Sequence, residues 1–152
     1  MQPDKPNRHV VSASALVPAR RERVYSLLAN YRDGHPRIVP RQITDIIVEQ
    51  GGVEAGTIVR FELSVFGKKQ TIRAAITEPE PGRVLVETAL DGNDAVTTFT
   101  VDPAAAAGDC TVTISTELKV RSGFGGWIAA ADIQTGTGQS VARCNRSVRW
   151  LT

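Results

Sequence analysis

The sequence predicts an α+β domain in which a curved, seven-stranded antiparallel sheet packs against a long C-terminal helix. Through the middle of the chain, at 43–120, apolar and polar residues alternate with a period of two between turns rich in glycine and proline. From Trp127 to Leu151 the apolar residues instead recur three and four positions apart, which is the spacing of one helix face. Successive strands joined by short turns pair antiparallel, and the inward face of such a sheet needs a cover, which the last helix supplies.

Length and composition are those of one globular domain. The chain has 152 residues, of which 41% are hydrophobic and 22% charged, and a domain of this size buries roughly 70% of its unfolded surface. We assign residues 1–8 to a flexible polar tail and residues 9–152 to the single domain. Its 18 basic and 16 acidic residues give a net charge of +2, which is too small for a protein whose main partner is nucleic acid.

The sequence predicts neither membrane insertion nor export. No apolar segment approaches the ~18 residues that a spanning helix requires, and the polar, proline-bearing beginning lacks the apolar stretch of a signal peptide. We therefore expect a cytoplasmic protein.

Cysteine and metal-ligand patterns point to no prosthetic group. Cys110 and Cys144 have no CxxC or CxxH companion, which predicts two reduced, half-buried thiols rather than a disulfide framework or a zinc site. No group of Asp, Glu and His has the spacing of metal ligands. We expect no metal and no cofactor.

The N-terminal part is predicted to be a strand followed by helices. The strand at 9–17 ends at Pro18, and proline is favoured in the first turn of a helix. A helix at 18–31 follows from apolar residues at positions i, i+3, i+4 and i+7: Val24, Leu27, Leu28 and Tyr31. Asp-Gly-His-Pro at 33–36 breaks this helix, and Pro40 limits a second helix to a single turn at 37–39.

Six further strands follow from the alternation, at 43–49, 59–65, 72–77, 84–90, 95–101 and 112–120. Their charged residues are assigned to the outer face of the sheet, where cross-strand charge pairing is expected: Arg60, Glu62, Arg73, Glu87 and Glu117. A register slip of one residue in the strand at 59–65 would instead turn Arg60 and Glu62 into the interior and make them catalytic candidates.

The C-terminal helix is predicted at 126–151. Gly136 and Gly138 each cost about 1 kcal/mol relative to alanine inside a helix, so a kink or break there is the alternative to a continuous helix. The apolar stripe points Gln134 and Thr137 toward the sheet, where an unpaired amide or hydroxyl costs about 1–3 kcal/mol. Their partners are then either a ligand or water, or else Thr97, Thr116 and the helix backbone.

Four segments and the order of the elements resemble the START/Bet v 1-like (SRPBCC) superfamily, within it the polyketide cyclase/dehydrase and lipid-transport group. The segments are ALVPARRERVYSLLA at 15–29, the stretch from Tyr31 through His35-Pro36 to Pro40, GTIVRF at 56–61 and EPEPG at 78–82. The resemblance covers about 9–151. It implies a helix-grip fold that binds lipids or polyketide-like molecules between the sheet and the last helix, and it implies no shared set of catalytic residues. The TGTG stretch at 135–138 departs from the usual unbroken last helix.

We interpret the chain as a non-enzymatic carrier or sensor of a hydrophobic small molecule, a lipid or a polyketide-like or aromatic compound. An apolar wall with a few uncharged polar side chains would hold the ligand: Phe61, Leu63, Ile72, Phe99, Ile114, Thr116, Leu118, Gln134, Thr137 and Val141. The alternative is a cyclase or dehydratase acting in the same cavity, which requires a buried titratable group, with His35, Arg60 and Glu62 as candidates. A third, less favoured interpretation is a module that binds a protein partner through an apolar groove.

Overall fold

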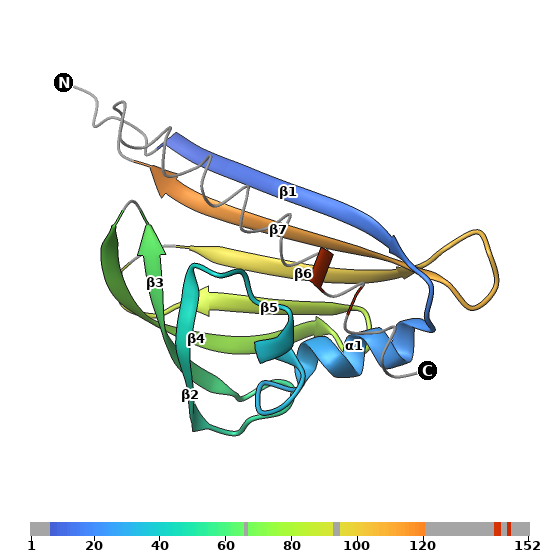
Figure 1. The fold of residues 1–152 in the computed structure, drawn as a ribbon, viewed down its shortest axis with the longest axis horizontal. Coiled ribbons are helices and arrows are strands. Elements are labelled where there is room, and N and C mark those ends of the chain that lie inside the picture. Colours follow the sequence, from blue (N-terminus) through green and yellow to red (C-terminus); the bar gives the residue numbers. More distant parts are fainter. Residues whose placement is uncertain (1–6, 66, 93–94, 121–141, 144–145, 147–152) are drawn as a thin grey trace.

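Seven strands form one antiparallel sheet in the order β1-β7-β6-β5-β4-β3-β2 (Figure 1). The computed structural model describes residues 7–65, 67–92, 95–120, 142, 143 and 146. The strands are β1 (Asn7–Val17), β2 (Ile43–Gln50), β3 (Ile58–Val65), β4 (Lys68–Glu80), β5 (Val84–Ala89), β6 (Val96–Pro103) and β7 (Cys110–Val120). Strands β2 to β7 are neighbours in chain order, and β7 then pairs with β1. The predicted seven-stranded antiparallel sheet is therefore confirmed.

The longest strand pair joins the beginning of the described chain to its last strand. β1 and β7 pair without a register shift from Asn7 opposite Val120 to Val17 opposite Cys110. β1 therefore begins at Asn7, two residues before the predicted start at His9. Where β2 meets β3, the register shifts twice, between Thr44 and Ile47 and between Val48 and Gln50, and such bulges bend a strand away from a flat sheet.

A single α-helix, α1 (Arg21–Ala29), follows β1 and is shorter than the predicted helix at 18–31. Arg20 is extended, with φ −62° and ψ 136°, so Pro18 lies before the helix rather than in its first turn. At the other end the Asn30 side-chain oxygen accepts hydrogen bonds from the backbone N–H groups of Arg32 and Asp33, both at 3.1 Å. This local hydrogen bonding competes with a further helical turn and ends α1.

A one-turn 3₁₀ helix, η1 (His35–Arg37), follows the break, two residues earlier than the predicted turn at 37–39. Its position matters because it places His35 inside the protein, with 5% of the residue exposed.

The core lies between α1 and one face of the sheet, which we call the inner face. Val24, Leu28 and Tyr31 of the α1–η1 segment are buried together with Leu85 and Phe99 of the sheet. The predicted apolar stripe of the first helix is thus the surface that packs on the sheet. Cys110 is a free thiol with 0% exposure, fully buried rather than half-buried as predicted, and burial raises the pKa of this thiol.

The predicted C-terminal helix at 126–151 falls mostly outside the described residues. Of that segment, Ala142, Arg143 and Arg146 are described, and all three are helical. The Arg143 guanidinium donates a hydrogen bond of 2.8 Å to the carbonyl oxygen of Val39, just after η1. Gln134, Thr137, Val141 and Cys144 lie outside the described residues. Within the part that is described, no helix is long and apolar enough to cross a membrane.

Candidate functional site

His35 is the centre of a buried polar cluster on the inner face. Its Nδ1 lies 2.8 Å from the carbonyl oxygen of Leu28, and because a carbonyl can only accept, Nδ1 carries the proton. The imidazole stacks on the ring of Tyr31, with centroids 4.3 Å apart, and meets Phe99 edge-on at 5.3 Å. These contacts fix the ring, and the remaining nitrogen, Nε2, points at the sheet.

Gly34 allows the turn before His35 to pack closely against α1. A Cβ atom at Gly34 would lie 2.3 Å from the carbonyl oxygen of Leu27, far inside van der Waals contact. The φ angle of Gly34 is −94°, so glycine is needed here for space and not for an unusual backbone angle. The turn after α1 can therefore fold back closely enough to hold η1 against the helix.

The carboxylate of Glu87 on β5 contacts the side chains of both Tyr31 and His35. The Tyr31 hydroxyl donates to Glu87 Oε1 at 2.6 Å, and His35 Nε2 lies 3.2 Å from the same oxygen. The side chains of His35 and Glu87 are only 7% and 14% exposed. The assignment of Glu87 to the outer face is therefore wrong, because this carboxylate has buried partners in the turn after α1 and on η1 and lies on the inner face.

Burial and neighbouring carboxylates keep both Tyr31 of the site and Tyr25 on α1 protonated. Desolvation, with the charge of Glu87 as the next cause, raises the pKa of Tyr31 well above its usual value. Tyr25 on α1 donates to Glu78 Oε1 at 2.5 Å, and desolvation followed by this hydrogen bond raises the pKa of Tyr25 as well. Both phenols are thus hydrogen-bond donors at neutral pH.

Glu87 belongs to a line of three oxygen-bearing side chains that we call the polar row: Glu87, Thr97 and Thr116. Glu87 pairs across the strands with Thr97, and Thr97 pairs with Thr116. The two threonine hydroxyls are 2.9 Å apart and bond to each other. The polar row crosses β5, β6 and β7 beside the parallel apolar row of Leu85, Phe99 and Ile114. It is therefore a polar stripe set into an apolar face.

The strand register places the predicted ligand-binding residues of the sheet on the inner face. Ile72, Phe99, Ile114 and Thr116 are buried, with 2–8% exposure, and Phe61, Leu63 and Leu118 are half-buried. Phe61 pairs directly with Ile72. Phe99 and Ile114 lie on one side of the polar row, and Leu118 follows Thr116 along β7 on its other side.

Of the three catalytic candidates, the structure brings only His35 into this site. Arg60 Nε lies 3.3 Å from Glu49, and Glu62 lies 3.9 Å from Lys69. Arg60 pairs across the strands with Arg73, which also bonds to Glu49, at 2.7 Å. The strand at 58–65 therefore has no register slip, and its charges form outer-face pairs as expected from the alternation. Glu117 likewise pairs with Arg8, at 2.6 Å.

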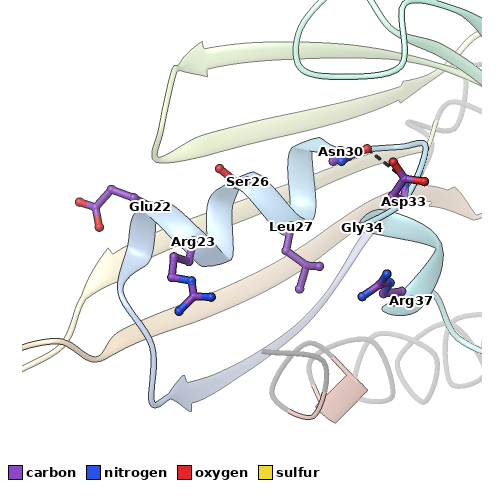
Figure 2. Close-up of a pocket in the computed structure, with 8 residues that line it drawn as sticks. All are labelled: Glu22, Arg23, Ser26, Leu27, Asn30, Asp33, Gly34 and Arg37. Carbon is purple, nitrogen blue, oxygen red and sulfur yellow. Dashed lines mark hydrogen bonds between the residues drawn. The ribbon is translucent and has the colours of Figure 1, made fainter. Parts of the chain in front are cut away.

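An open depression lies over α1 and η1. Its volume is about 430 Å³, and its lining comes from α1, the turn that follows it and η1: Glu22, Arg23, Ser26, Leu27, Asn30, Asp33, Gly34 and Arg37. Figure 2 shows these side chains. Its charged side chains, two acidic and two basic, balance one another. None of its lining residues belongs to the polar row, so it is separate from the inner-face site.

The match to a family model decides to which protein family the chain belongs. The model for polyketide cyclase / dehydrase and lipid transport matches residues 8–149. The chain belongs to this family. The resemblance to the START/Bet v 1-like superfamily is thereby confirmed. No curated protein matches the sequence.

Solved structures show how widely this family's fold is shared. The NMR structure of the KanY protein superposes with a TM-score of 0.82 at 18% identity, covering 94% of this chain and 99% of the other. The ZhuI aromatase/cyclase from Streptomyces sp. R1128 superposes with a TM-score of 0.78 at 12% sequence identity, covering 94% of each chain. A START superfamily protein from Mycobacterium smegmatis superposes with a TM-score of 0.74 at 14% sequence identity, covering 95% of this chain and 99% of the other. At these identities the likeness establishes the fold, and the inner-face site has to be understood from its own residues.

Sequence reasoning missed Glu87 as a site residue, although a signal was present. Leu85 and Glu87 are two positions apart on β5 and therefore point to the same face. Leu85 is fully buried, so its apolar character indicated which face that was. The general expectation that charges point outward hid this signal.

Proposed function

We propose that this member of the polyketide cyclase/dehydrase and lipid-transport family binds a hydrophobic small molecule, a lipid or a polyketide-like aromatic compound, against the inner face of its sheet. The observation that carries the proposal is the polar row set into an apolar surface. Apolar area supplies the affinity of such sites, and a few fixed polar groups supply orientation. The ligand's polar end lies on the polar row and its apolar body on Phe61, Ile72 and Leu118. Gln134, Thr137 and Val141 are proposed as contacts from the C-terminal segment.

The Thr97–Thr116 pair suits this role chemically. Each hydroxyl has one donor and two acceptor positions, so the bond between them leaves one hydrogen and further lone pairs for a ligand. A hydroxyl group buried without a full set of partners costs about 1–3 kcal/mol. A ligand oxygen that completes the set is therefore bound more tightly than an apolar group of the same size.

Ligand binding is tested by thermal unfolding and native mass spectrometry with fatty alcohols, fatty acids and hydroxylated polycyclic aromatics. A ligand at about 1,000-fold excess over its Kd stabilises the protein by ~4 kcal/mol. Thr116→Val removes one hydroxyl of the pair at constant shape, and we expect it to weaken binding about fivefold or more.

Thr113→Val is the matched control, because Thr113 lies on the same strand and its hydroxyl bonds to Ser14 at 2.8 Å. We expect ligand affinity to be unchanged in this variant. If none of the three ligand classes stabilises the wild-type protein, or if both variants weaken binding equally, the proposed site is wrong.

A second candidate function is acid–base catalysis of the cyclase or dehydratase type in the same place. The observation that favours it is the His35–Glu87 pair. Because His35 Nδ1 holds its proton toward Leu28, the contact between Nε2 and the carboxylate of Glu87 is where a further proton is gained or lost. Turnover of a polyketide-like substrate that is lost in both His35→Gln and Glu87→Gln, with binding retained in His35→Gln, would establish this function. Binding without turnover by the wild type would exclude it for that substrate.

A further inference from the structure

We propose that Glu87 makes the inner-face site selective for neutral ligands that carry a hydroxyl group, either an alcohol or a phenol. This inference rests on the proposed function and specifies the chemical class of its ligand. It derives from the way in which the two oxygens of the Glu87 carboxylate are used.

Both partners of Glu87 among the described residues occupy the same oxygen. Tyr31 donates to Oε1 at 2.6 Å, and His35 Nε2 approaches Oε1 at 3.2 Å. Neither of them uses Oε2. A carboxylate offers about four acceptor positions, and the Glu87 side chain is only 14% exposed. Within the described part of the chain, this largely buried carboxylate thus keeps acceptor capacity beyond its two partners.

The place of Glu87 in the polar row directs that capacity toward the ligand. Thr97 lies directly opposite Glu87 on the neighbouring strand, and neighbouring strands are about 4.8 Å apart. A single ligand hydroxyl can bridge this distance by donating its hydrogen to Glu87 while its oxygen accepts from the threonine pair. The polar row therefore offers an acceptor and a donor side by side, which is the complement of a hydroxyl group.

The same geometry discriminates against other polar groups. A ketone, ester or ether has only lone pairs to offer, and these would face the oxygens of Glu87. A fatty carboxylate would bring a second negative charge to the same place. Sites built to hydrogen-bond a hydroxyl reject analogues without one strongly, because their own buried groups are then left unpaired.

The test compares matched probes on the full chain. 2-Naphthol and 2-methoxynaphthalene share an aromatic body, and 1-dodecanol and methyl dodecyl ether share an aliphatic body. In each pair a methyl group replaces the hydroxyl hydrogen. We expect the wild-type protein to bind the hydroxyl member of at least one pair about tenfold or more tightly than its ether, the typical effect of a hydrogen bond to a charged group. In Glu87→Gln this preference falls below about threefold.

Glu117→Gln is the matched control, because Glu117 is a strand carboxylate on the outer face that pairs with Arg8. It keeps the wild-type preference. Equal affinity for both members of each pair in the wild type, or a preference that survives in a folded Glu87→Gln variant, overturns the role of Glu87 while leaving hydrophobic binding intact. Failure of all four probes to bind overturns the inference; the proposed function falls only if the fatty acids and hydroxylated polycyclic aromatics also fail to bind. The wild-type comparison needs no variant, so the test stands even if Glu87→Gln does not fold.

Discussion

At the scale of single residues, the inner-face site depends on Glu87 lying among donors. Tyr31 donates to its carboxylate, His35 Nε2 lies 3.2 Å from the same oxygen, and Thr97 lies opposite it on the neighbouring strand. A buried carboxylate is tolerated only where polar partners exist. Tyr31 comes from a segment 56 residues earlier in the chain. Helical and strand periodicity describe local faces, so this pairing could not be predicted from either segment alone.

The two tyrosines provide a spectroscopic test of these contacts. The chain contains only Tyr25 and Tyr31, and the pKa of each is raised by burial and by a neighbouring carboxylate. We expect no tyrosinate absorbance at 295 nm as the native protein is taken through pH 10, the ordinary tyrosine pKa. The signal should appear only when alkaline unfolding exposes both phenols.

The sign of the pH dependence follows from the direction of the shifts. A pKa that is higher in the folded than in the unfolded state contributes stability that is complete below the unfolded value and is lost as the pH rises above it. The free energy of unfolding should therefore decrease above about pH 10, and more steeply for the wild type than for Tyr31→Phe. A reversible titration of both tyrosines near pH 10 in the folded protein would show that neither phenol is buried against a carboxylate.

At the scale of elements, the strands could be predicted and the helix ends could not. Alternation fixes which strand residues share a face, and it placed Arg60, Glu62 and Arg73 correctly on the outer face. The ends of α1 depend on the extended backbone at Arg20 and on the hydrogen bonds that the Asn30 side chain accepts. The spacing of apolar residues carries no information about either. The burial of His35 depends in turn on where α1 ends.

Gly34 tests whether the close return of the chain after α1 positions the site. Gly34→Ala puts a methyl group against the carbonyl oxygen of Leu27, so η1 must move outward. We expect a loss of about 1–3 kcal/mol in the free energy of unfolding, typical of overpacking, measured by chemical denaturation. The His35–Glu87 contact should weaken at the same time.

Ser26→Ala serves as the control for this variant, because Ser26 is an exposed residue of the same helix and its removal should change stability by less than about 0.5 kcal/mol. Unchanged stability of Gly34→Ala would mean that the turn does not lie against Leu27.

At the scale of the whole molecule, the sheet brings distant parts of the sequence to one surface. Glu87, Thr97 and Thr116 come from three strands, and the turn after α1 and η1 supply Tyr31 and His35, which complete the cluster. The family's fold could be predicted from the order of elements and a few motifs. The sequence placed Thr97 and Thr116 on the inner face, but it could not predict the polar row, because only the register between strands makes these threonines neighbours of each other and of Glu87.

The most direct test of ligand binding at the polar row is an NMR titration of protein with isotope-labelled threonine methyl groups, using 2-naphthol as the probe. Saturable shifts of the Thr97 and Thr116 methyl resonances, with Thr113 on the opposite face of β7 unaffected, are the predicted result. Shifts confined to outer-face threonines, or no saturable shift of Thr97 and Thr116 while 2-naphthol binds, would contradict it.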